Sequence, residues 1–216
     1  MKVLVACEES QAVCTAFRER GHEAYSCDIQ EPSGEHPEWH ILGDALQAVQ
    51  GGQVTTMDGC AHDIGSWDLL IAHPPCTYLS NAGAVRMRVN GEIVAERYAK
   101  MLEAKAFFLD FWDAAIPKIC VENPVPMKLC ELPLYKQIVQ PYEHGHPYSK
   151  RTCLWLKGLP KLEPTNIVEN HVPYVNGGCK DAHGNYRRFQ GRKDRDPKIR
   201  AKTFAGIAAA MAEQWG

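Results

Sequence analysis

The sequence predicts a mixed α/β fold built around a mostly parallel sheet. Several short runs are mostly apolar and lack regular polar alternation, which is typical of strands covered on both faces. A helical pattern separates the first two runs, as in a β-α-β unit with its right-handed crossover. Polar and reactive side chains follow directly after the runs, where ligands bind in open α/β sheets. The apolar runs lie at residues 2–6, 23–27, 67–73 and 118–121.

The N-terminal part of the chain is predicted to hold three strands and one helix. Gly21 stops the helical pattern, and Asp28 follows the second apolar run. Turn-forming residues then lead into a short strand that ends at Gly43-Asp44. The expected order is strand 2–6, helix 10–20, strand 23–27 and strand 39–42.

The middle of the chain carries the strongest strand and the longest helix. The strand at 67–73 continues directly into Pro74-Pro75-Cys76. A helical pattern covers residues 92–115 and is stopped by Pro117. The next strand, 118–121, ends at Glu122-Asn123-Pro124. The polar and reactive side chains of this region therefore follow directly after predicted strands.

The C-terminal part of the chain differs from the preceding part in composition and periodicity. Residues 137–142 and 152–156 are predicted to be two strands of an antiparallel edge. Residues 157–198 are rich in Gly, Pro and Asn and have little periodicity, which predicts a short irregular region. A helix over residues 203–214 closes the chain.

The composition is that of a globular protein in a reducing compartment. The chain has 216 residues, 45% of them hydrophobic, which suits one sizeable domain. No apolar run is long enough to cross a bilayer. Glu8 and Glu9 interrupt the first apolar run, so we expect no signal peptide. The nine cysteines are odd in number and include no Cys-x-x-Cys pair, which favours reduced thiols in a cytoplasm.

The net charge of −2 conceals an asymmetry. Residues 180–202 hold nine Lys/Arg and three Asp, a local charge of +6, so the remainder of the chain is acidic. The same stretch contains Tyr186, Arg187, Arg188 and Phe189, which mix cations with aromatic rings. Such a segment fits either a polyanion contact or a solvated loop, and charge alone leaves both open.

Cys76 is the candidate nucleophile. Two prolines stiffen the backbone before it and fix the thiol at the end of a buried strand. A thiolate held in this way adds readily to an electrophilic carbon. The other eight cysteines lack such a context and are expected to be structural.

Glu122 is the candidate acid of the same site. A carboxyl group that emerges from a buried strand can have a raised pKa and donate a proton or a hydrogen bond. On its own, such a glutamate is more often a cap or a surface group. A Pro-Pro-Cys segment on another strand of the same predicted sheet favours the catalytic reading.

These two motifs resemble those of DNA cytosine-5 methyltransferases. Pro74-Pro75-Cys76 resembles the family's Pro-Pro-Cys nucleophile motif, and Glu122-Asn123-Pro124 resembles its Glu-Asn-Val motif. The chain looks most like the compact, phage-type members, over about residues 1–156 and the last helix. The resemblance implies a Rossmann-like fold that binds S-adenosyl-methionine, in the cytoplasm of a bacterial or phage-infected cell.

The resemblance also implies a mechanism on a cytosine flipped out of double-stranded DNA. Cys76 would add to C6 of the ring, and Glu122 would hydrogen-bond to N3 and the exocyclic amine. C5 would then take the methyl group, and loss of the C5 proton would release Cys76. Asn123 belongs to the same motif, and Arg151, in a segment resembling the family's Gln-x-Arg-x-Arg strand, would orient Glu122 or hold the cytosine carbonyl.

The cofactor residues implied by the resemblance lie after the first three strands. The family's Phe-x-Gly-x-Gly motif corresponds here to a loop without glycine, where Ser10 and Gln11 could present backbone N–H groups at a helix N-terminus. Asp28 would grip ribose hydroxyls and Asp44 would contact the adenine amine, although each could instead cap a turn or a helix. The expected cofactor-binding residues are Cys7, Glu8, Ser10, Gln11, Asp28, Ile29, Asp44 and Pro74.

The resemblance divides the chain into three parts. Residues 1–156 would be the catalytic domain, residues 157–198 a small basic region for nucleic-acid contact, and residues 199–216 a helix that packs back on the core. So small a recognition region implies relaxed or very short sequence specificity, or a second subunit that helps. The expected DNA contacts are Ser80, Asn81, Arg187, Arg188, Arg192 and Lys193.

Two other readings remain open at this point. One is a related pyrimidine-modifying enzyme that acts on RNA or a free nucleotide, or that uses another one-carbon donor. The other is a catalytically silent nucleic-acid-binding module. His144, His146, Cys179 and His183 do not have the spacing of a zinc-ligand set, so we expect no metal.

Overall fold

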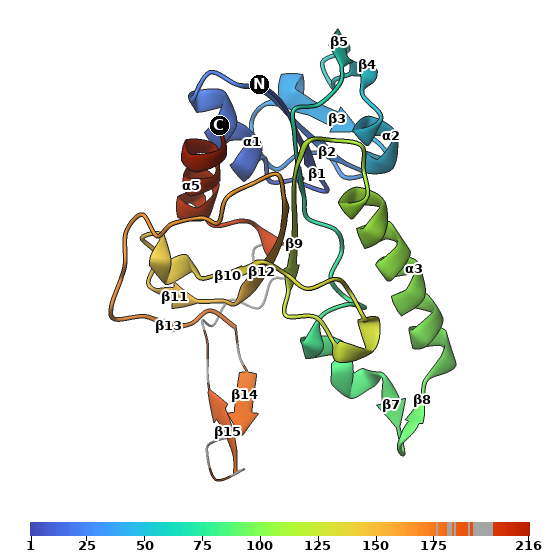
Figure 1. The fold of residues 1–216 in the computed structure, drawn as a ribbon, viewed down its shortest axis with the longest axis vertical. Coiled ribbons are helices and arrows are strands. Elements are labelled where there is room, and N and C mark those ends of the chain that lie inside the picture. The colour runs from blue at the N-terminus through green and yellow to red at the C-terminus, as the bar shows by residue number, and fades with distance from the viewer. Residues whose placement is uncertain (176, 181–182, 184, 190, 192–200) are drawn as a thin grey trace.

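The computed structural model describes residues 1–175, 177–180, 183, 185–189, 191 and 201–216. Its centre is a seven-stranded sheet with the spatial order β10-β12-β9-β6-β1-β2-β3 (Figure 1). The predicted α/β fold with a mostly parallel sheet is therefore confirmed. The strands are β1 (Lys2–Ala6), β2 (Glu23–Asp28), β3 (His40–Leu42), β6 (Leu69–Ala72), β9 (Lys118–Pro124), β10 (Gln137–Val139) and β12 (Thr152–Lys157).

Five strands of this sheet are parallel, and one edge is not. β1 pairs in parallel with β2 and β6, β2 with β3, and β6 with β9. β12 runs antiparallel to both β9 and β10, as the sequence predicts for this edge. Taken in chain order, the five parallel strands are arranged 3-2-1-4-5, the order found in doubly wound nucleotide-binding folds. In such sheets the ligand crevice opens where the order reverses, which is between β1 and β6.

Helices cover both faces of the sheet, because the strands are apolar on both sides (Figure 1). α1 (Ala12–Glu19) and α5 (Ala205–Trp215) pack on one face, over Val3, Val5 and Ile71. α2 (Ala45–Val49) and α3 (Ala95–Trp112) pack on the other face, over Leu4 and Leu70. Of the helices that the structure describes, none has the length and apolar character needed to span a membrane.

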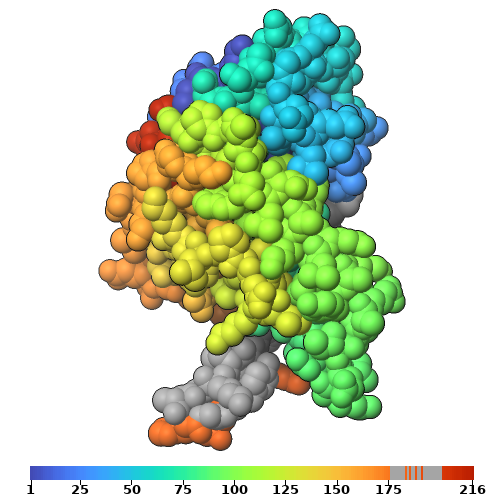
Figure 2. Space-filling view, turned by 45° about the vertical axis from the view of Figure 1, so that its right-hand side comes forward, coloured from blue at the N-terminus to red at the C-terminus, as the bar shows by residue number. Residues whose placement is uncertain are grey.

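Short strands and 3₁₀ helices lie around this core. In Figure 2 the segment around β7 and β8, with the first turns of α3, projects from the body. Within the described residues, four pairs of short strands lie outside the central sheet: β4 (Gly52–Thr55) with β5 (Ala61–Gly65), β7 (Arg88–Val89) with β8 (Glu92–Ile93), β11 (Tyr148–Ser149) with β13 (Val172–Pro173), and β14 (Gly177–Lys180) with β15 (Tyr186–Phe189). The short 3₁₀ helices are η1 (Pro37–Trp39), η2 (Asn81–Arg86), η3 (Lys128–Cys130) and η4 (Pro141–Glu143).

The structure departs from the predicted elements at several places, and the largest differences lie between residues 45 and 95. The long helix begins at Ala95, because Glu92 and Ile93 pair with Arg88 and Val89 in the β7–β8 hairpin. Residues 45–65, for which no element was predicted, form α2 and the β4–β5 hairpin. Asp44 starts α2 by accepting the Leu46 N–H, which satisfies one donor of its first turn.

The segment after β12 begins as part of the core. Leu159 and Leu162 are buried against the α1–α5 face, and Tyr174 is buried as well. The hairpin of β14 and β15 follows from Gly177 onward. Much of the basic segment that was assigned to nucleic-acid contact, including Arg192 and Lys193, lies outside the described residues.

Candidate active site at the carboxyl edge of the sheet

A histidine and a glutamate meet at the centre of the carboxyl edge. β6 and β9 run parallel with Ala72 opposite Val121, so the next residues, His73 and Glu122, fall side by side. The Nδ1 atom of His73 lies 3.0 Å from Oε2 of Glu122, and their side chains are 14% and 15% exposed. The His73 N–H also donates to the carbonyl of Ala6, which ties this point to β1. Strand register therefore builds the pair.

Each member of the pair favours the charged form of the other. Burial alone would raise the pKa of Glu122, but the hydrogen bond and charge of His73, with the charge of Lys150, hold that pKa below its usual range. Burial alone would lower the pKa of His73, but Glu122 and then Glu8 raise it above its usual value. Glu122 therefore does not have the raised pKa that a carboxyl group emerging from a buried strand can have, because His73 lies beside it.

Glu8 is buried in the loop between β1 and α1. Its side chain accepts the Val13 N–H at 2.7 Å and the Cys14 N–H at 3.2 Å, in the first turn of α1. Burial raises the pKa of Glu8, against the lowering effect of His73 and these two bonds. A carboxylate of the protein thus fills the helix N-terminus, where many nucleotide-binding folds place a phosphate.

The loop from Cys7 to Gln11 makes its turns without glycine. Cys7 and Gln11 have φ angles of 58° and 57°, in the left-handed region that glycine adopts at least cost. The Ser10 hydroxyl lies 3.4 Å from the Ala12 N–H at the start of α1. This geometry needs other contacts to hold it, and Gln11 supplies them.

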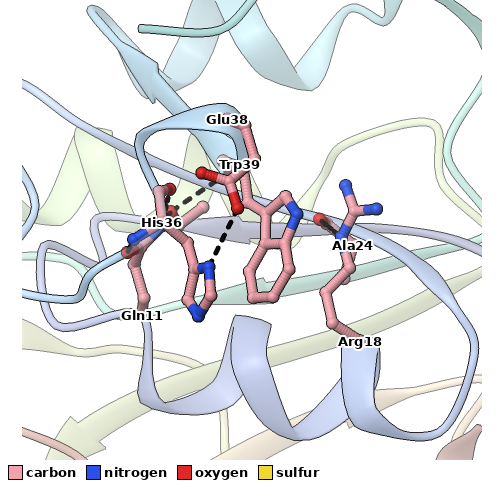
Figure 3. A network of polar contacts seen from close by, with 7 residues as sticks. Gln11, Arg18, Ala24, His36, Glu38 and Trp39 are labelled. Carbon is pink, nitrogen blue, oxygen red and sulfur yellow. Dashed lines mark hydrogen bonds and ion pairs between the residues drawn. The ribbon is translucent and has the colours of Figure 1, made fainter. Parts of the chain in front are cut away.

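The Gln11 side chain is buried in the network of Figure 3. Its Nε2 donates to the His36 carbonyl at 2.8 Å and its Oε1 accepts the His36 N–H at 3.2 Å. The His36 ring stacks on Trp39 with centroids 3.6 Å apart, and the Arg18 guanidinium lies 5.2 Å from the Trp39 ring. A Cβ atom at Gly34 would lie 2.3 Å from Gln11 Oε1, so glycine is required there. Gln11 is therefore occupied in holding the loop between β2 and β3 against the start of α1.

Two aspartates lie at the ends of β2 and β3. Asp28 Oδ1 accepts the Gln30 N–H at 2.9 Å, and Asp44 Oδ1 accepts the Leu46 N–H at 2.9 Å. Burial, followed by the charges of Asp28, Cys27 and Asp44, raises the pKa of the Cys7 thiol. Each aspartate keeps a second carboxylate oxygen in addition to the capping one. Ile29, beside Asp28, is 80% exposed and offers an apolar surface at the same corner.

The loop that carries Cys76 is tied to the segment that follows Glu122. The Asn81 N–H donates to the Val125 carbonyl and the Met127 N–H to the Leu79 carbonyl, both at 2.8 Å. Ser80 forms an isolated bridge with Pro126, and the Cys76 carbonyl accepts the Ser80 N–H at 2.9 Å. Cys76 itself is partly buried, and Pro74 before it is buried. These bonds join the two predicted catalytic motifs into one unit.

The remaining predicted residues are placed less centrally. Asn123 is buried, and alternation along β9 turns it away from Glu122 toward the α3 face, where its Oδ1 has no partner among the described residues. Arg151, which was expected to orient Glu122 or hold the cytosine carbonyl, is exposed. The side chain that hydrogen-bonds to Glu122 is that of His73. Ser80 is buried and Asn81 is exposed at the start of η2. Arg187 and Arg188 lie on β15, where Arg188 is exposed.

His73 is the residue of this site that sequence reasoning missed. Its position directly before Pro74-Pro75-Cys76, at the end of a strand, was the available signal. The histidines considered for zinc have other contacts. His144 lies 3.1 Å from the Thr165 hydroxyl, and His146 Nε2 accepts the Gly206 N–H at the start of α5. The described residues hold no cluster of three or more potential metal ligands.

Comparison with known proteins finds similarity in shape alone. No family model matches the chain, and no curated protein sequence matches it. Among solved structures, an E. coli prophage-encoded protein described as a DNA modification methyltransferase aligns with TM-score 0.45 and 13% identity, over 81% of this chain and 53% of that one. The Entamoeba histolytica methyltransferase EhMeth aligns with TM-score 0.42 and 12% identity, over 78% and 57%. This chain therefore spans little more than half the length of either protein.

Proposed function

We propose that this protein is a methyltransferase that uses S-adenosyl-methionine to methylate C5 of cytosine in DNA, with Cys76 as nucleophile and Glu122 as the group that binds the base. The observation that carries the proposal is the joining of the two motif loops at the carboxyl edge. Main-chain bonds of Leu79 and Asn81 tie the loop after Cys76 to the segment after Glu122, which supports a shared site for the thiol and the carboxylate. That site lies beside the point where the strand order reverses.

The choice of donor rests on the charge at the start of α1. A dinucleotide would bring its pyrophosphate to this helix N-terminus, where the Glu8 carboxylate already accepts two N–H groups. S-adenosyl-methionine carries a sulfonium and no phosphate, so the acidic corner fits it. When bound, it would supply an electrophilic methyl group.

The corner at β2 and β3 fits the remaining parts of the donor. Asp28 would accept hydrogen bonds from the ribose hydroxyls and Asp44 from the adenine amine, through the oxygens that do not cap the backbone. Ile29 would cover the adenine ring with its exposed side chain. Cys7 and Pro74 would line the space between this corner and Cys76.

The roles at the base follow from the chemistry of the pyrimidine ring. Cys76, as its thiolate, would add to C6 and so make C5 nucleophilic. Glu122 would accept a hydrogen bond from the exocyclic amine and pass a proton to N3, which offsets the charge that develops in the ring. The target base would have to leave the duplex to reach both groups.

The nucleic acid would contact the loop after Cys76 and the basic hairpin. Ser80 and Asn81 follow the nucleophile directly, and Arg187 and Arg188 lie on β15. Arg192 and Lys193 extend the same charge along the sequence. Cationic side chains of this kind bind phosphates without reading the base sequence, which agrees with the small recognition region.

Transfer of labelled methyl groups tests the proposal. The protein would be incubated with the labelled donor and, in separate reactions, with duplex DNA, RNA or a free cytidine nucleotide. We expect label at C5 of cytosine in DNA. Label only in RNA or the nucleotide would contradict the DNA assignment, and no label in any substrate, with donor binding shown by calorimetry, would contradict the methyltransferase assignment.

A pair of cysteine variants tests the nucleophile. Cys76→Ala should abolish transfer, because no other group at the site would add to C6. Cys60→Ala is the matched control, since Cys60 is exposed between β4 and β5, away from the carboxyl edge. Equal activity of the two variants would remove Cys76 from the mechanism.

A further inference from the structure

We infer that His73 is the positioning residue of this active site: it orients Glu122 and holds the proton that Glu122 passes to N3 of the pyrimidine. The inference rests on the proposed function and extends it to a residue outside the two motifs. No other described side chain makes a hydrogen bond to Glu122. The orientation of that carboxylate therefore depends on His73.

The geometry gives each carboxylate oxygen a separate task. His73 Nδ1 lies 3.0 Å from Oε2 of Glu122, which leaves Oε1 for a ligand. The main chain at His73 is fixed, because its backbone N–H is bonded to the Ala6 carbonyl and the next residue is a buried proline. Glu122 is equally fixed, since it lies within β9 with Leu154 of β12 opposite. A rigid pair of this kind is what base recognition requires.

The charges around His73 favour its protonated form. Glu122 on β9 and Glu8 in the loop before α1 are the acidic groups that act on it, and Lys150 before β12 is the opposing cation. The first two prevail, so the pKa of His73 is raised. Its second ring nitrogen, Nε2, is buried and has no hydrogen-bond partner among the described residues. A buried polar atom without a partner is uncommon and is often retained for function.

The proton transfer balances through the two residues. The Sγ–C6 bond forms, the C5=C6 electron pair moves to C4–C5, and the C4=N3 pair moves to N3. Oε2 of Glu122 takes the proton from Nδ1 of His73, which becomes neutral, and passes that proton on to N3. When the Sγ–C6 bond breaks later, the N3 proton returns along the same path. Glu122 is an anion before and after, so no additional acid is needed.

Two substitutions of His73 distinguish its role in orienting Glu122 from its role in supplying a proton. In His73→Asn the amide Nδ2 can occupy the place of Nδ1 and still donate to Glu122, but it holds no titrating proton. In His73→Phe both properties are lost. His171→Asn is the control, because His171 is exposed and stacks on Tyr142, in the segments around η4 and β13.

Kinetics on the full chain should rank these variants. For His73→Asn we expect kcat to fall by about 10²-fold, with an unchanged KM for the donor. We expect kcat of the wild type to decline as pH rises through the pKa of His73, and this decline to be lost in His73→Asn. His73→Phe should lose more activity than His73→Asn. A His73→Asn variant with the wild-type kcat and pH profile would overturn the inference.

An NMR titration of His73 separates failure of this inference from failure of the proposed function. We expect His73 to titrate above its ordinary value of 6.5 in the wild type and lower in Glu122→Gln. This result needs no substrate, so it holds or fails even for a protein that transfers no methyl group. A His73 that titrates at or below 6.5, unchanged by Glu122→Gln, would overturn the inference. Circular dichroism of each variant would verify that it is folded.

Discussion

Polar groups differ in their hydrogen bonding between the two ends of the central strands. These ends are the amino edge, where the parallel strands begin, and the carboxyl edge, where they finish. At the amino edge, Lys2 Nζ donates to the Ile64 carbonyl, the Lys2 N–H donates to Asp68, and the Trp67 indole donates to the Ala48 carbonyl, each at 2.7 Å. At the carboxyl edge, His73 and Asn123 each have a buried polar atom without a partner among the described residues. Polar satisfaction thus distinguishes the amino edge from the carboxyl edge, where we propose the active site.

The amino edge also has a cavity, which shows that space alone does not mark a site. It measures about 310 Å³ and lies between α2, α3 and the starts of β6 and β9. Its lining is largely apolar or exposed, and it holds none of the predicted catalytic or cofactor-binding residues. The lining residues are Leu46, Val49, Gln50, Ser66, Trp67, Asp110, Ala114, Ala115 and Ile116.

The largest difference in methyl-transfer rate should appear between two variants, each of which replaces a carboxylate by an amide of the same shape. Glu122→Gln keeps the shape of the carboxyl edge but removes the charge beside His73, so methyl transfer should fall by about 10²- to 10⁴-fold. Asp110→Asn makes the same change at the amino-edge cavity and should leave the rate unchanged. Steady-state kinetics of both variants would check this, and a comparable loss in Asp110→Asn would erase the functional difference between the edges.

The amino edge should matter for stability. Trp67 is 2% exposed, and its indole is hydrogen-bonded to Ala48. Trp67→Ala should lower the free energy of unfolding by about 3–5 kcal/mol because it leaves a cavity. The kcat of the folded fraction should stay unchanged. Urea unfolding, paired with kinetics at low temperature, measures both quantities, and a stable variant with reduced kcat would reverse the assignment.

Glu8 links the two roles, because it caps α1 and faces His73. Glu8→Ala removes the acceptor of the Val13 and Cys14 N–H groups and should destabilise the protein by about 1–3 kcal/mol. Glu8→Gln keeps an acceptor and removes a charge whose pKa burial raises, so it should cost less. Chemical denaturation compares the two, and an equal loss of stability would show that the carboxylate charge, rather than the acceptor, supports the helix.

The charged pair also predicts how stability varies with pH. The pKa of His73 is higher in the folded state than the unfolded value of 6.5, so its stabilising contribution is complete below 6.5 and disappears as pH rises through the folded pKa. The pKa of Glu122 is below its unfolded value of 4.5, so its contribution is present above 4.5 and disappears as pH falls through the folded pKa. The melting temperature should therefore be highest between pH 4.5 and pH 6.5, where both contributions are present.

The His73→Asn variant is the control for this profile. Its melting temperature should decline less than that of the wild type as pH rises above 6.5, because no histidine proton is lost there. Identical alkaline slopes for the two proteins, measured by differential scanning calorimetry, would show that His73 is not the titrating group.

The smallest predicted effect concerns the hairpin of β14 and β15. Arg188 is exposed there, and Arg188→Ala should weaken binding to duplex DNA of any sequence. The slope of log affinity against log salt should become shallower by about 1 if the arginine contacts one phosphate. Fluorescence anisotropy at several salt concentrations would measure it, and an unchanged slope would place the DNA elsewhere.

The sequence predicted the sheet well because its strands are apolar on both faces. Such runs stand out at residues 67–73 and 118–121, and the reactive residues after them could be assigned to one edge. The short elements α2, β4 and β5 could not be predicted, because five-residue helices and small hairpins depend on tertiary contacts rather than on periodicity.

The details of the site were harder to predict for a related reason. The contact of His73 with Glu122 depends on the register of β6 against β9, which no local pattern reveals. The left-handed angles of Cys7 and Gln11 similarly depend on the buried network around Gln11. Glu8 was expected near the cofactor, and only the fold shows that its carboxylate already caps α1.

Covalent trapping tests the central claim most directly. The protein would be mixed with S-adenosyl-methionine and duplex DNA that contains 5-fluorocytosine, and the products would be analysed by intact mass and peptide mapping. Fluorine cannot leave C5 as a proton does, so an adduct of protein, DNA and one methyl group should accumulate on Cys76. A methylated product without an adduct, or an adduct on another residue, would contradict the proposed mechanism.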